Sequence, residues 1–568
     1  MPSTRPALSV DAILARSGLA RIGAVPLLTA LALTLLIPGF FTLPPMDRDE
    51  PRFAQASKQM LESADLVAIR FGDEARNKKP VGIHWLQVAA VLTGETLGVP
   101  HARRHIWLYR IPSLAGAVAA VLLTFWAAAP FLTPPGAALA AALFAATPLL
   151  GVEARLATTD AVLAASVVAA MGALARAYLL RDAARGAGLG TAAVFWVAIA
   201  AGVLLKGPVT PLVAALAVLV LCWRERSGRW LWALRPAAGL ALCLLAVAPW
   251  FVLILVQTKG AFLADAVGHD LLGKVAGGQE MHGAPPGFYA LTFWLTGWPL
   301  APFVLLAAPA LWRLCGERAA AFLLAWIVPA WLVFELVTTK LVHYALPLFP
   351  GLAIAAVYGL ERGLRACGRR SGWALFVLLA TLPTLVLGLV LAGQGRVWSL
   401  APAALVCAAG AAVASVALGW RARAGLVASG LRGAVPSAVL AAVPLYLFVY
   451  AYLLTPGVAP ALAVSPRLAA AAGASLGAGC PDPLYATVGD REPSLMFATD
   501  ARLLMTDAAG AARFLEGGGC RAAFVDDRAE PAFKAALDRD LPVREVARIA
   551  GIAVNGGKAL DIAVYVRS

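Results

Sequence analysis

Long apolar stretches recur along most of the chain, and short polar segments separate them. Each stretch holds roughly 17 to 25 residues, enough for a helix to cross a hydrocarbon core about 30 Å thick. The pattern predicts about thirteen membrane-spanning helices. The first is expected over residues 21–43 as an uncleaved span. The others centre near Ala120, Ala141, Val168, Ala198, Ala215, Leu245, Leu305, Leu324, Ile354, Ala380, Val406 and Tyr446.

The pattern changes after about Pro456, where short apolar runs are separated by Gly, Asp and Pro. We predict strands over 484–488, 501–505, 521–525, 543–549 and 560–566, and helices over 492–497, 508–515 and 530–537. Such alternation is typical of a small α/β sandwich. The chain is therefore divided into a membrane domain, residues 1–455, and a soluble domain, residues 456–568. The soluble domain has no phosphate loop or catalytic cluster, and we expect it to cap or support the membrane part.

Composition and charge agree with a polytopic membrane protein and set its orientation. Apolar residues make up 61% of the chain and charged residues 14%. Every second short loop is basic, which indicates the cytoplasmic side; examples are Arg181, Arg224, Arg313, Arg362 and Arg421. An odd number of spans after a cytoplasmic N-terminus places the soluble domain outside, in the periplasm of a Gram-negative bacterium. The net charge of +15 then reflects topology and bound anionic lipid, and no basic stripe with interleaved aromatics indicates nucleic-acid binding.

The seven cysteines divide between the two domains. Cys480 and Cys520 each precede a predicted strand of the soluble domain, in the oxidising compartment. If those strands are parallel neighbours, the two cysteines come within bridging distance. Two free thiols are the alternative.

The first external loop, residues 44–107, breaks the rule that positive residues are depleted outside. Its basic residues include Arg52, Lys58, Arg70, Lys78, Lys79, Arg103 and Arg104, with Arg110 just beyond. Residues 55–61 and 81–91 keep helical periodicity and are interpreted as helices on the membrane surface. A basic loop at this depth suits phosphate headgroups. The alternative is a solvated loop that is merely charged.

A second set of ionisable residues lies at the external ends of other spans, where such groups are expensive and usually functional. These residues are Asp160, Lys206, Lys340 and His343, with Tyr344 beside them. On this topology they face the same side as Asp49 and Glu50. Together they suit transfer of a phosphate-activated sugar, because cations can hold the leaving phosphate while a carboxylate orients or deprotonates the acceptor.

Each of these residues also has a milder interpretation. Asp160 could cap a helix, Lys206 could extend its ammonium toward water, and His343 could be a satisfied core histidine. The functional interpretation gains weight from their common location.

The motifs resemble those of the lipid A aminoarabinose transferases, within the wider group of polyprenyl-phosphate-dependent glycosyltransferases of GT-C type. The similar segments, in chain order, are Asp49-Glu50-Pro51-Arg52-Phe53-Ala54, Lys79-Pro80 with His84-Trp85-Leu86, Thr159-Asp160, Leu205-Lys206-Gly207, His282-Gly283-Ala284-Pro285-Pro286, and Thr339-Lys340 with Tyr344-Ala345-Leu346-Pro347. They run from the first span to the tenth.

The resemblance implies an inverting membrane glycosyltransferase that moves a sugar from a polyprenyl-phosphate donor to a lipid A-type glycolipid on the periplasmic side of the inner membrane. It implies catalytic roles for Asp49, Glu50 and Asp160. It also implies substrate-binding roles for a second set, namely Arg52, Lys79, Lys206, His282, Lys340, His343 and Tyr344. Besides donor and acceptor, membrane lipids are the expected partners.

Two departures from the family pattern bear on the substrate and on a metal. Lys78 stands where the aminoarabinose transferases usually have a Glu, and Phe53 replaces a Tyr. The first change makes a divalent metal site hard to carry over and favours an acidic sugar or an extra phosphate. The sugar is therefore left open. Alternative functions are transfer to another glycan or to a protein, a lipid-linked sugar carrier, and a non-catalytic assembly protein.

Overall fold

The computed structural model describes residues 23–45, 49–182, 187–266, 268, 283–363, 368–477, 479–480, 482–500, 502–538, 541–553 and 557–567. Within them, a helix covers the centre of every predicted span. Among these described helices, nine are long and apolar enough to cross a membrane. Seven of them are α5 (Ile106–Ala128), α8 (Asp160–Leu179), α9 (Leu189–Lys206), α11 (Pro236–Gln257), α16 (Arg318–Leu336), α18 (Arg369–Gly393) and α19 (Pro402–Ser429). The other two are Val342–Arg362, made of the 3-10 helix η6 (Val342–Leu348) and most of α17 (Phe349–Gly363), and Leu431–Leu453, which contains α20 (Leu431–Leu440) and α21 (Ala442–Phe448). The chain is a polytopic α-helical membrane protein, as predicted.

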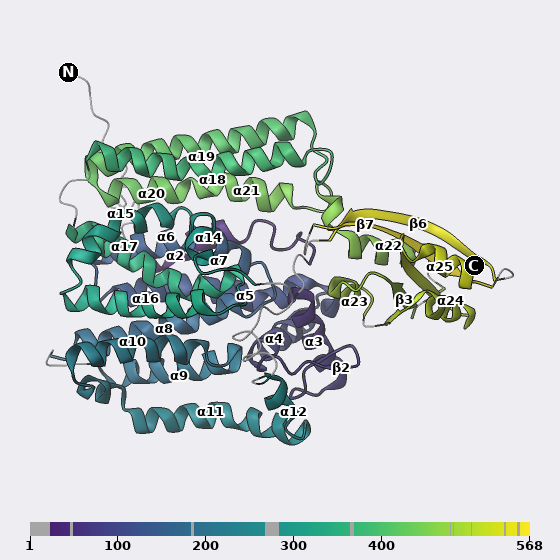
Figure 1. Ribbon diagram of the computed structural model, residues 1–568, viewed down its shortest axis with the longest axis horizontal. Coiled ribbons are helices and arrows are strands. Elements are labelled where there is room, and N and C mark those ends of the chain that lie inside the picture. The colour runs from purple at the N-terminus through teal and green to yellow at the C-terminus, as the bar shows by residue number, and fades with distance from the viewer. Residues whose placement is uncertain are drawn as a thin grey trace.

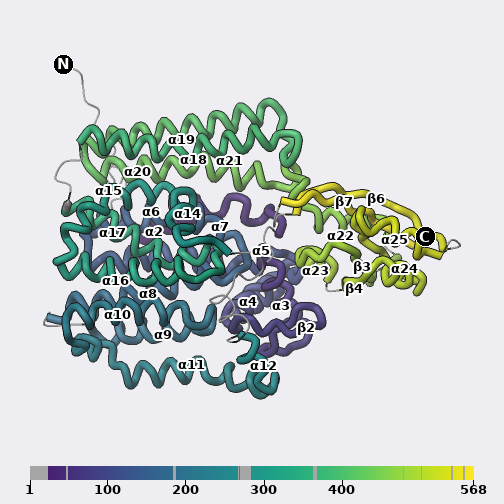
Figure 2. The backbone as a smooth tube through the Cα atoms, in the orientation of Figure 1, coloured from purple at the N-terminus to yellow at the C-terminus, as the bar shows by residue number. Residues whose placement is uncertain are grey.

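Shorter helices complete the bundle, in which the long axes run roughly parallel (Figure 1). They are α2 (Ala24–Leu36), α6 (Pro134–Ala145), α7 (Pro148–Glu153), α10 (Val209–Glu225), α14 (Phe288–Thr296) and α15 (Leu300–Arg313). Following the chain in Figure 2, α9, α10 and α11 form one side of the bundle and α18, α19 and α20 the other. Helices α5, α6, α8 and α17 lie between them.

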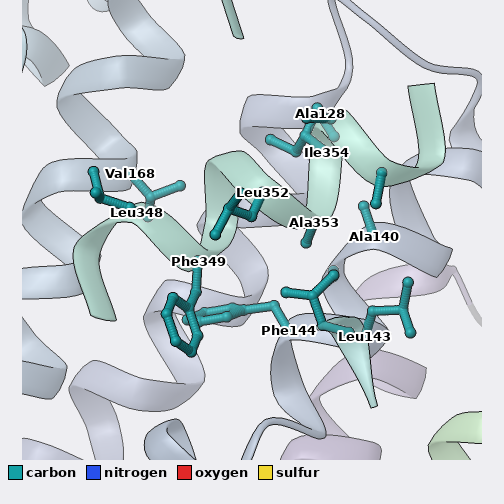
Figure 3. Close-up of a cluster of buried hydrophobic side chains, with 14 of the residues drawn as sticks. Ala128, Ala140, Leu143, Phe144, Val168, Leu348, Phe349, Leu352, Ala353 and Ile354 are labelled. Carbon is teal, nitrogen blue, oxygen red and sulfur yellow. The ribbon is translucent and has the colours of Figure 1, made fainter. Parts of the chain in front are cut away.

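Small residues let the central helices pack closely. Figure 3 shows Ala353 of α17 near Ala140 of α6, with the larger Phe349 beside Phe144. All four side chains are fully buried or nearly so. Because lipid tails are as apolar as Leu, close packing of this kind drives association of helices inside a membrane.

The first external loop folds into two helices, α3 (Asp49–Ser63) and α4 (Gly82–Thr96), with a two-stranded hairpin between them, β1 (Arg70–Phe71) and β2 (Glu74–Ala75). Helix α3 begins at Asp49, earlier than predicted, and so places two acids in its first turn, where the helix dipole favours negative charge. It also differs from the predicted membrane-surface helix, because most of its residues are buried.

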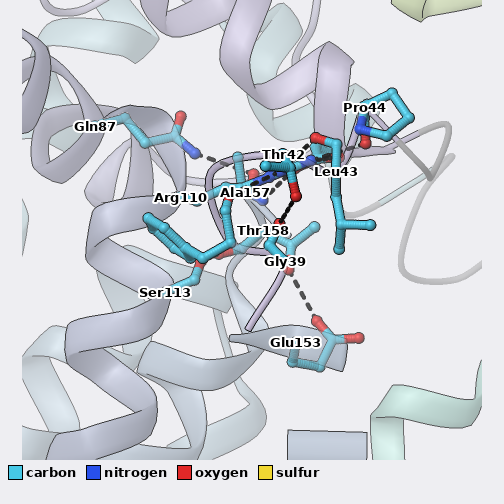
Figure 4. Close-up of polar contacts among 12 residues, drawn as sticks. Gly39, Thr42, Leu43, Pro44, Gln87, Arg110, Ser113, Glu153, Ala157 and Thr158 are labelled. Carbon is cyan, nitrogen blue, oxygen red and sulfur yellow. Dashed lines mark hydrogen bonds and ion pairs between the residues drawn. The ribbon is translucent and has the colours of Figure 1, made fainter. Parts of the chain in front are cut away.

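A buried ion pair fixes the start of α3. Arg110 of α5 donates from Nε to Glu50 Oε1 at 2.6 Å and from Nη2 to Oε2 at 3.0 Å, and both side chains are 0% exposed. Its other N–H groups donate to the carbonyls of Phe40, Leu43 and Pro44 after α2. Figure 4 shows this junction, where Arg110, Leu43 and Pro44 meet. The end of α2, the start of α3 and the start of α5 are thereby joined.

The C-terminal domain is a mixed five-stranded sheet in the order β4-β3-β5-β7-β6. Its elements are α22 (Val464–Leu476), β3 (Leu484–Val488), α23 (Pro493–Ala498), β4 (Leu503–Thr506), α24 (Ala508–Glu516), β5 (Arg521–Asp526), α25 (Glu530–Ala536), β6 (Val543–Ile552) and β7 (Ala559–Arg567). Strand β3 is parallel to both β4 and β5, whereas β7 is antiparallel to β5 and β6. Helices α22 and α23 cover one face and α24 and α25 the other. The predicted α/β class is confirmed, and α22 is an additional helix.

The sheet topology also explains a disulfide between Cys480 and Cys520, whose Cα atoms lie 5.6 Å apart. These cysteines precede β3 and β5, which are neighbouring parallel strands with Leu484 opposite Arg521. The register therefore brings the two thiols together. The described cysteines of the membrane part are free.

The buried ion pair generates a first prediction about stability. Arg110→Met leaves the Glu50 carboxylate buried without its guanidinium and should lower the free energy of unfolding by about 3–5 kcal/mol. The measurement is unfolding of the purified protein in mixed micelles titrated with SDS. Arg318→Met is the control, because its ion pair with Asp182 is exposed and should contribute only about 0–1 kcal/mol. Equal losses in the two variants would contradict the central role of Arg110.

Candidate active site

Ionisable side chains from several segments converge where the membrane helices meet the first loop. Asp49 and Arg52 come from α3, and Arg76 and Lys79 from the loop before α4. Span ends supply the rest. We call this set the ionisable cluster, and its members are Asp49, Arg52, Arg76, Lys79, Asp160, Lys206 and His343.

Asp49 lies among cations. Its Oδ1 atom is 3.4 Å from Arg76 Nη2 and 3.7 Å from Arg52 Nη1. Burial alone would raise the pKa of Asp49, but attraction to Lys79, Arg76 and Arg52 outweighs it and holds the pKa well below its ordinary range. Asp49 is therefore a carboxylate at every physiological pH.

Lys79 is influenced by both acids of the cluster. Burial lowers its pKa to about 8, while Asp49 and Asp160 act to raise that pKa and the nearby cations Lys206 and Arg76 lower it further. The buried ring of Phe53 lies beneath this region, with Lys79 Nζ 4.9 Å and Arg76 Cζ 4.7 Å from its centroid. A cation over an aromatic face is attracted by the ring quadrupole, so Phe53 helps to place both cations.

Asp160 is the second acid of the cluster, and it is paired with Lys206. Asp160 is the first residue of α8, and its Oδ1 accepts from Lys206 Nζ at 2.5 Å. Lys206 is the last residue of α9, which ends because Gly207 adopts a positive φ of 62°. The Lys206 ammonium also lies 4.8 Å from the centre of the Tyr344 ring.

His343 of η6 lies near Asp160. Its Nε2 atom is 3.9 Å from Asp160 Oδ2, and its Nδ1 atom is 3.7 Å from Glu153 Oε1. Its ring meets the Tyr344 ring edge to face, with centroids 5.0 Å apart. The imidazole thus lies between two carboxylates, at longer than hydrogen-bond distance from each.

Three further residues named from the sequence lie apart from the cluster or outside the described residues. Glu50 is bound to Arg110 and also accepts from the backbone N–H of Ala157 at 3.1 Å. Lys340 donates to the carbonyls of Ala284 and Val337, at 2.8 Å and 2.7 Å. His282 lies outside the described residues.

Sequence reasoning missed two members of this region. Arg76 contacts Asp49 from a polar turn whose residues carry no pattern that would single it out. Glu153 is 3% exposed in α7, and Thr158 Oγ1 donates to it at 2.9 Å. An acid inside an otherwise apolar stretch was a usable signal, since such residues are usually functional.

The acids of the site do not fit a divalent metal. Asp49 faces Arg52 and Arg76, and Asp160 is paired with Lys206. Metal sites for hard cations need several carboxylate or carbonyl oxygens facing one point. Among the described residues, no group of three or more His, Cys, Asp or Glu has that arrangement.

Comparison with known proteins gives consistent similarities. The sequence pattern of the dolichyl-phosphate-mannose-protein mannosyltransferase family matches residues 53–262. The undecaprenyl phosphate-alpha-4-amino-4-deoxy-L-arabinose arabinosyl transferase of Edwardsiella ictaluri is 28% identical over 55% of this chain and 55% of its own length. The corresponding enzyme of Aeromonas hydrophila is 27% identical over 61% of this chain and 63% of its own length. The matched part thus spans little more than half of these relatives.

A solved structure extends the similarity to nearly the whole chain. The crystal structure of ArnT from Cupriavidus metallidurans bound to undecaprenyl phosphate superposes with a TM-score of 0.73 at 20% identity, over 95% of this chain and 97% of that one. The chain has the ArnT fold. The resemblance seen in the motifs is confirmed, and the fold is of GT-C type. The archaeal oligosaccharyltransferase AglB from Archaeoglobus fulgidus is more distant, with a TM-score of 0.51 at 12% identity over 91% of this chain and 70% of that one.

The electrostatics of the cluster generate a second prediction. Asp49 acts to raise the pKa of Lys79, so Asp49→Asn should lower that pKa below its value of about 8. The measurement is a pH titration of ¹³C-methylated lysine followed by NMR. Asp182→Asn, at an exposed ion pair far along the chain, should leave the Lys79 pKa unchanged. An unchanged or raised pKa in Asp49→Asn would show that the two side chains are not neighbours.

Proposed function

We propose that this chain is a membrane glycosyltransferase that takes its sugar from a polyprenyl-phosphate donor. The observation that carries the proposal is Asp49, a partly buried carboxylate held ionised among Arg52, Arg76 and Lys79. Carboxylates that stay charged beside several cations suit a reaction in which an anionic phosphate leaves and an acceptor must be oriented. The similarity to a protein crystallised with undecaprenyl phosphate supports the same donor class.

The cations are assigned to the donor phosphate. Arg52 and Arg76 lie beside Asp49, and Lys206 is paired with Asp160. The Lys79 ammonium is close enough to be influenced by both carboxylates. Negative charge grows on the donor phosphate oxygen as the bond to the anomeric carbon breaks, and fixed cations stabilise that charge most strongly in a site that excludes water. Lys340 is proposed to support the structure of the site rather than to bind the phosphate, because its ammonium already donates to the carbonyls of Ala284 and Val337.

In the proposed reaction, an acceptor oxygen forms a bond to the anomeric carbon while the bond from that carbon to the phosphate oxygen breaks. The polyprenyl phosphate leaves with the electron pair, and the configuration inverts. Asp49 and Asp160 orient the reactants, with His343 beside Asp160. If the acceptor oxygen belongs to a phosphate, whose second ionisation is near ~6, it is already nucleophilic at neutral pH and needs no strong base.

The acceptor is proposed to be a lipid A-type glycolipid reaching the site from the periplasmic leaflet of the inner membrane. The disulfide of the sheet domain supports that orientation, because such bonds persist in the periplasm rather than in the cytosol. In Figure 1 the sheet domain lies at the same end of the bundle as α3 and α4. Another glycan or a protein is the alternative acceptor.

Glu50 is proposed as a positioning residue rather than a catalytic one. Its carboxylate is fully buried, and Arg110 and the Ala157 amide donate to its oxygens, so these oxygens are used in holding the fold. Its role is to fix the first turn of α3, from which the neighbouring Asp49 projects.

The proposal predicts that the purified chain transfers a sugar from a polyprenyl-phosphate donor to lipid A and that Asp49→Asn lowers the rate at least ~100-fold. The measurement is the single-turnover rate with saturating donor. Asp182→Asn should retain the wild-type rate. A carrier would instead move intact donor between vesicle leaflets without breaking the sugar–phosphate bond, and that result in the wild-type protein would overturn the proposal.

Donor binding should depend on pH through Lys79. Because the pKa of Lys79 is about 8 in the free protein, raising the pH above 8 removes its positive charge and should weaken binding of undecaprenyl phosphate. The affinity should then fall by about twofold between pH 7 and 8 and more steeply from pH 8 to 10, approaching tenfold per pH step once Lys79 is mostly neutral. Lys79→Arg, which keeps its proton over this range, should hold its affinity to higher pH. The same decline in both variants would exclude Lys79 as the titrating group.

A further inference from the structure

The sheet domain rests on the helix that carries Asp49. Its short helix α23 packs against α3, and Phe497 at the end of α23 is 5% exposed. The Phe497 ring meets the Tyr109 ring edge to face with centroids 5.6 Å apart, within an apolar cluster that also contains Ala54 of α3. The contact is a packed interface between parts of the chain that are remote in sequence.

A charged contact lies at the centre of this interface. Lys58 of α3 is 2% exposed, and its ammonium donates to Asp500 Oδ1 and lies 5.4 Å from the centre of the Phe497 ring. The second oxygen of Asp500 is 2.7 Å from Arg104 Nη2 of the 3-10 helix η2 (Ala102–Arg104). Asp500 thus joins the sheet domain to two segments of the first loop.

The backbone at Asp500 adopts an uncommon conformation. Its φ of 56° lies in the left-handed region, which costs energy for a residue with a side chain. Such a conformation persists where surrounding contacts hold it. The ion pairs to Lys58 and Arg104 are contacts of that kind.

Helix α3 is held at successive points along its length. Glu50 is bound by Arg110 at the start, and Ser57 lies 2.8 Å from His84 Nδ1 and donates to Gln87 Oε1 at 2.6 Å. Lys58, the residue after Ser57, donates to Asp500. Asp49 lies about nine residues before Lys58, roughly 14 Å along the same helix.

We propose that Asp500 is a positioning residue through which the sheet domain holds α3, and with it Asp49, in the geometry that the site needs. The inference rests on the proposed function. Removing the Asp500 charge leaves the Lys58 ammonium buried beside a neutral partner, an arrangement that costs more than losing both partners together. Helix α3 relieves that cost by moving Lys58 toward water. A shift of about 1 Å at the reacting groups is enough to cost on the order of 100-fold in rate.

The experiment compares Asp500→Asn with the wild-type full-length protein by three measurements. Hydrogen exchange of the peptide amides in α3 should quicken, and the single-turnover rate at saturating donor should fall by about 10- to 100-fold. The pKa of Lys79 should fall, as predicted for Asp49→Asn. The last measurement separates positioning from mere stabilisation, because a residue that only stabilises the fold would not change the surroundings of Lys79. Asp482→Asn is the matched control, since its ion pair with Arg502 lies on the exposed surface of the same domain.

A conservative variant keeps the test decisive if Asp500→Asn fails to fold. Asp500→Glu retains the charge and should keep most of the wild-type rate and the wild-type pKa of Lys79. Wild-type exchange in α3 together with a wild-type Lys79 pKa in Asp500→Asn would overturn the positioning role. If the wild-type protein transfers no sugar, the proposed function fails, and the exchange and pKa measurements still decide the role of Asp500.

Discussion

The site depends on the buried contacts of Arg110, which join the end of α2, the start of α3 and the start of α5. Arg110 directs its donors at the two oxygens of Glu50 and at the carbonyls of Phe40, Leu43 and Pro44, all away from water. A buried guanidinium is tolerable only when its donors are satisfied and its charge is balanced. Glu50 balances the charge of Arg110. Successive helical residues point about 100° apart, so the preceding residue, Asp49, projects in another direction and can take part in the proposed chemistry.

Elsewhere in the site, too, some charged side chains hold the fold and others are placed where they can contact a substrate. Arg155, 2% exposed, donates to the carbonyls of Leu35, Pro38 and Gly151 and so closes the end of α2 against α7. Lys79 and Lys206, by contrast, lie beside carboxylates and aromatic rings. Cations paired with backbone carbonyls are committed to the fold, whereas cations that share carboxylates can exchange part of that interaction for a phosphate.

Much of this could be predicted from the sequence, because spans, strands and span-end charges are local signals. The strands over 484–488 and 521–525 and the start of α8 at Asp160 follow directly from apolar runs and their polar boundaries. The pairing partners could not be predicted in this way. Arg110 and Glu50 are separated by 60 positions and Lys58 and Asp500 by 442, and only the packed structure shows which charges meet.

Helix α3 could not be interpreted correctly from its own pattern because it is buried on most of its surface. An interfacial helix would show an apolar face and a polar face, yet Gln55, Ser57 and Lys58 are buried beside Ala54 and Ala56. Buried polar groups are usually hydrogen-bonded, and here Ser57 has its partners in α4 of the same loop, whereas Lys58 has its partner in the sheet domain. The counter-charge of the buried Lys58 therefore comes from outside the first loop. The sheet domain, to which no chemistry is assigned, thus contributes directly to the surroundings of the helix that carries Asp49.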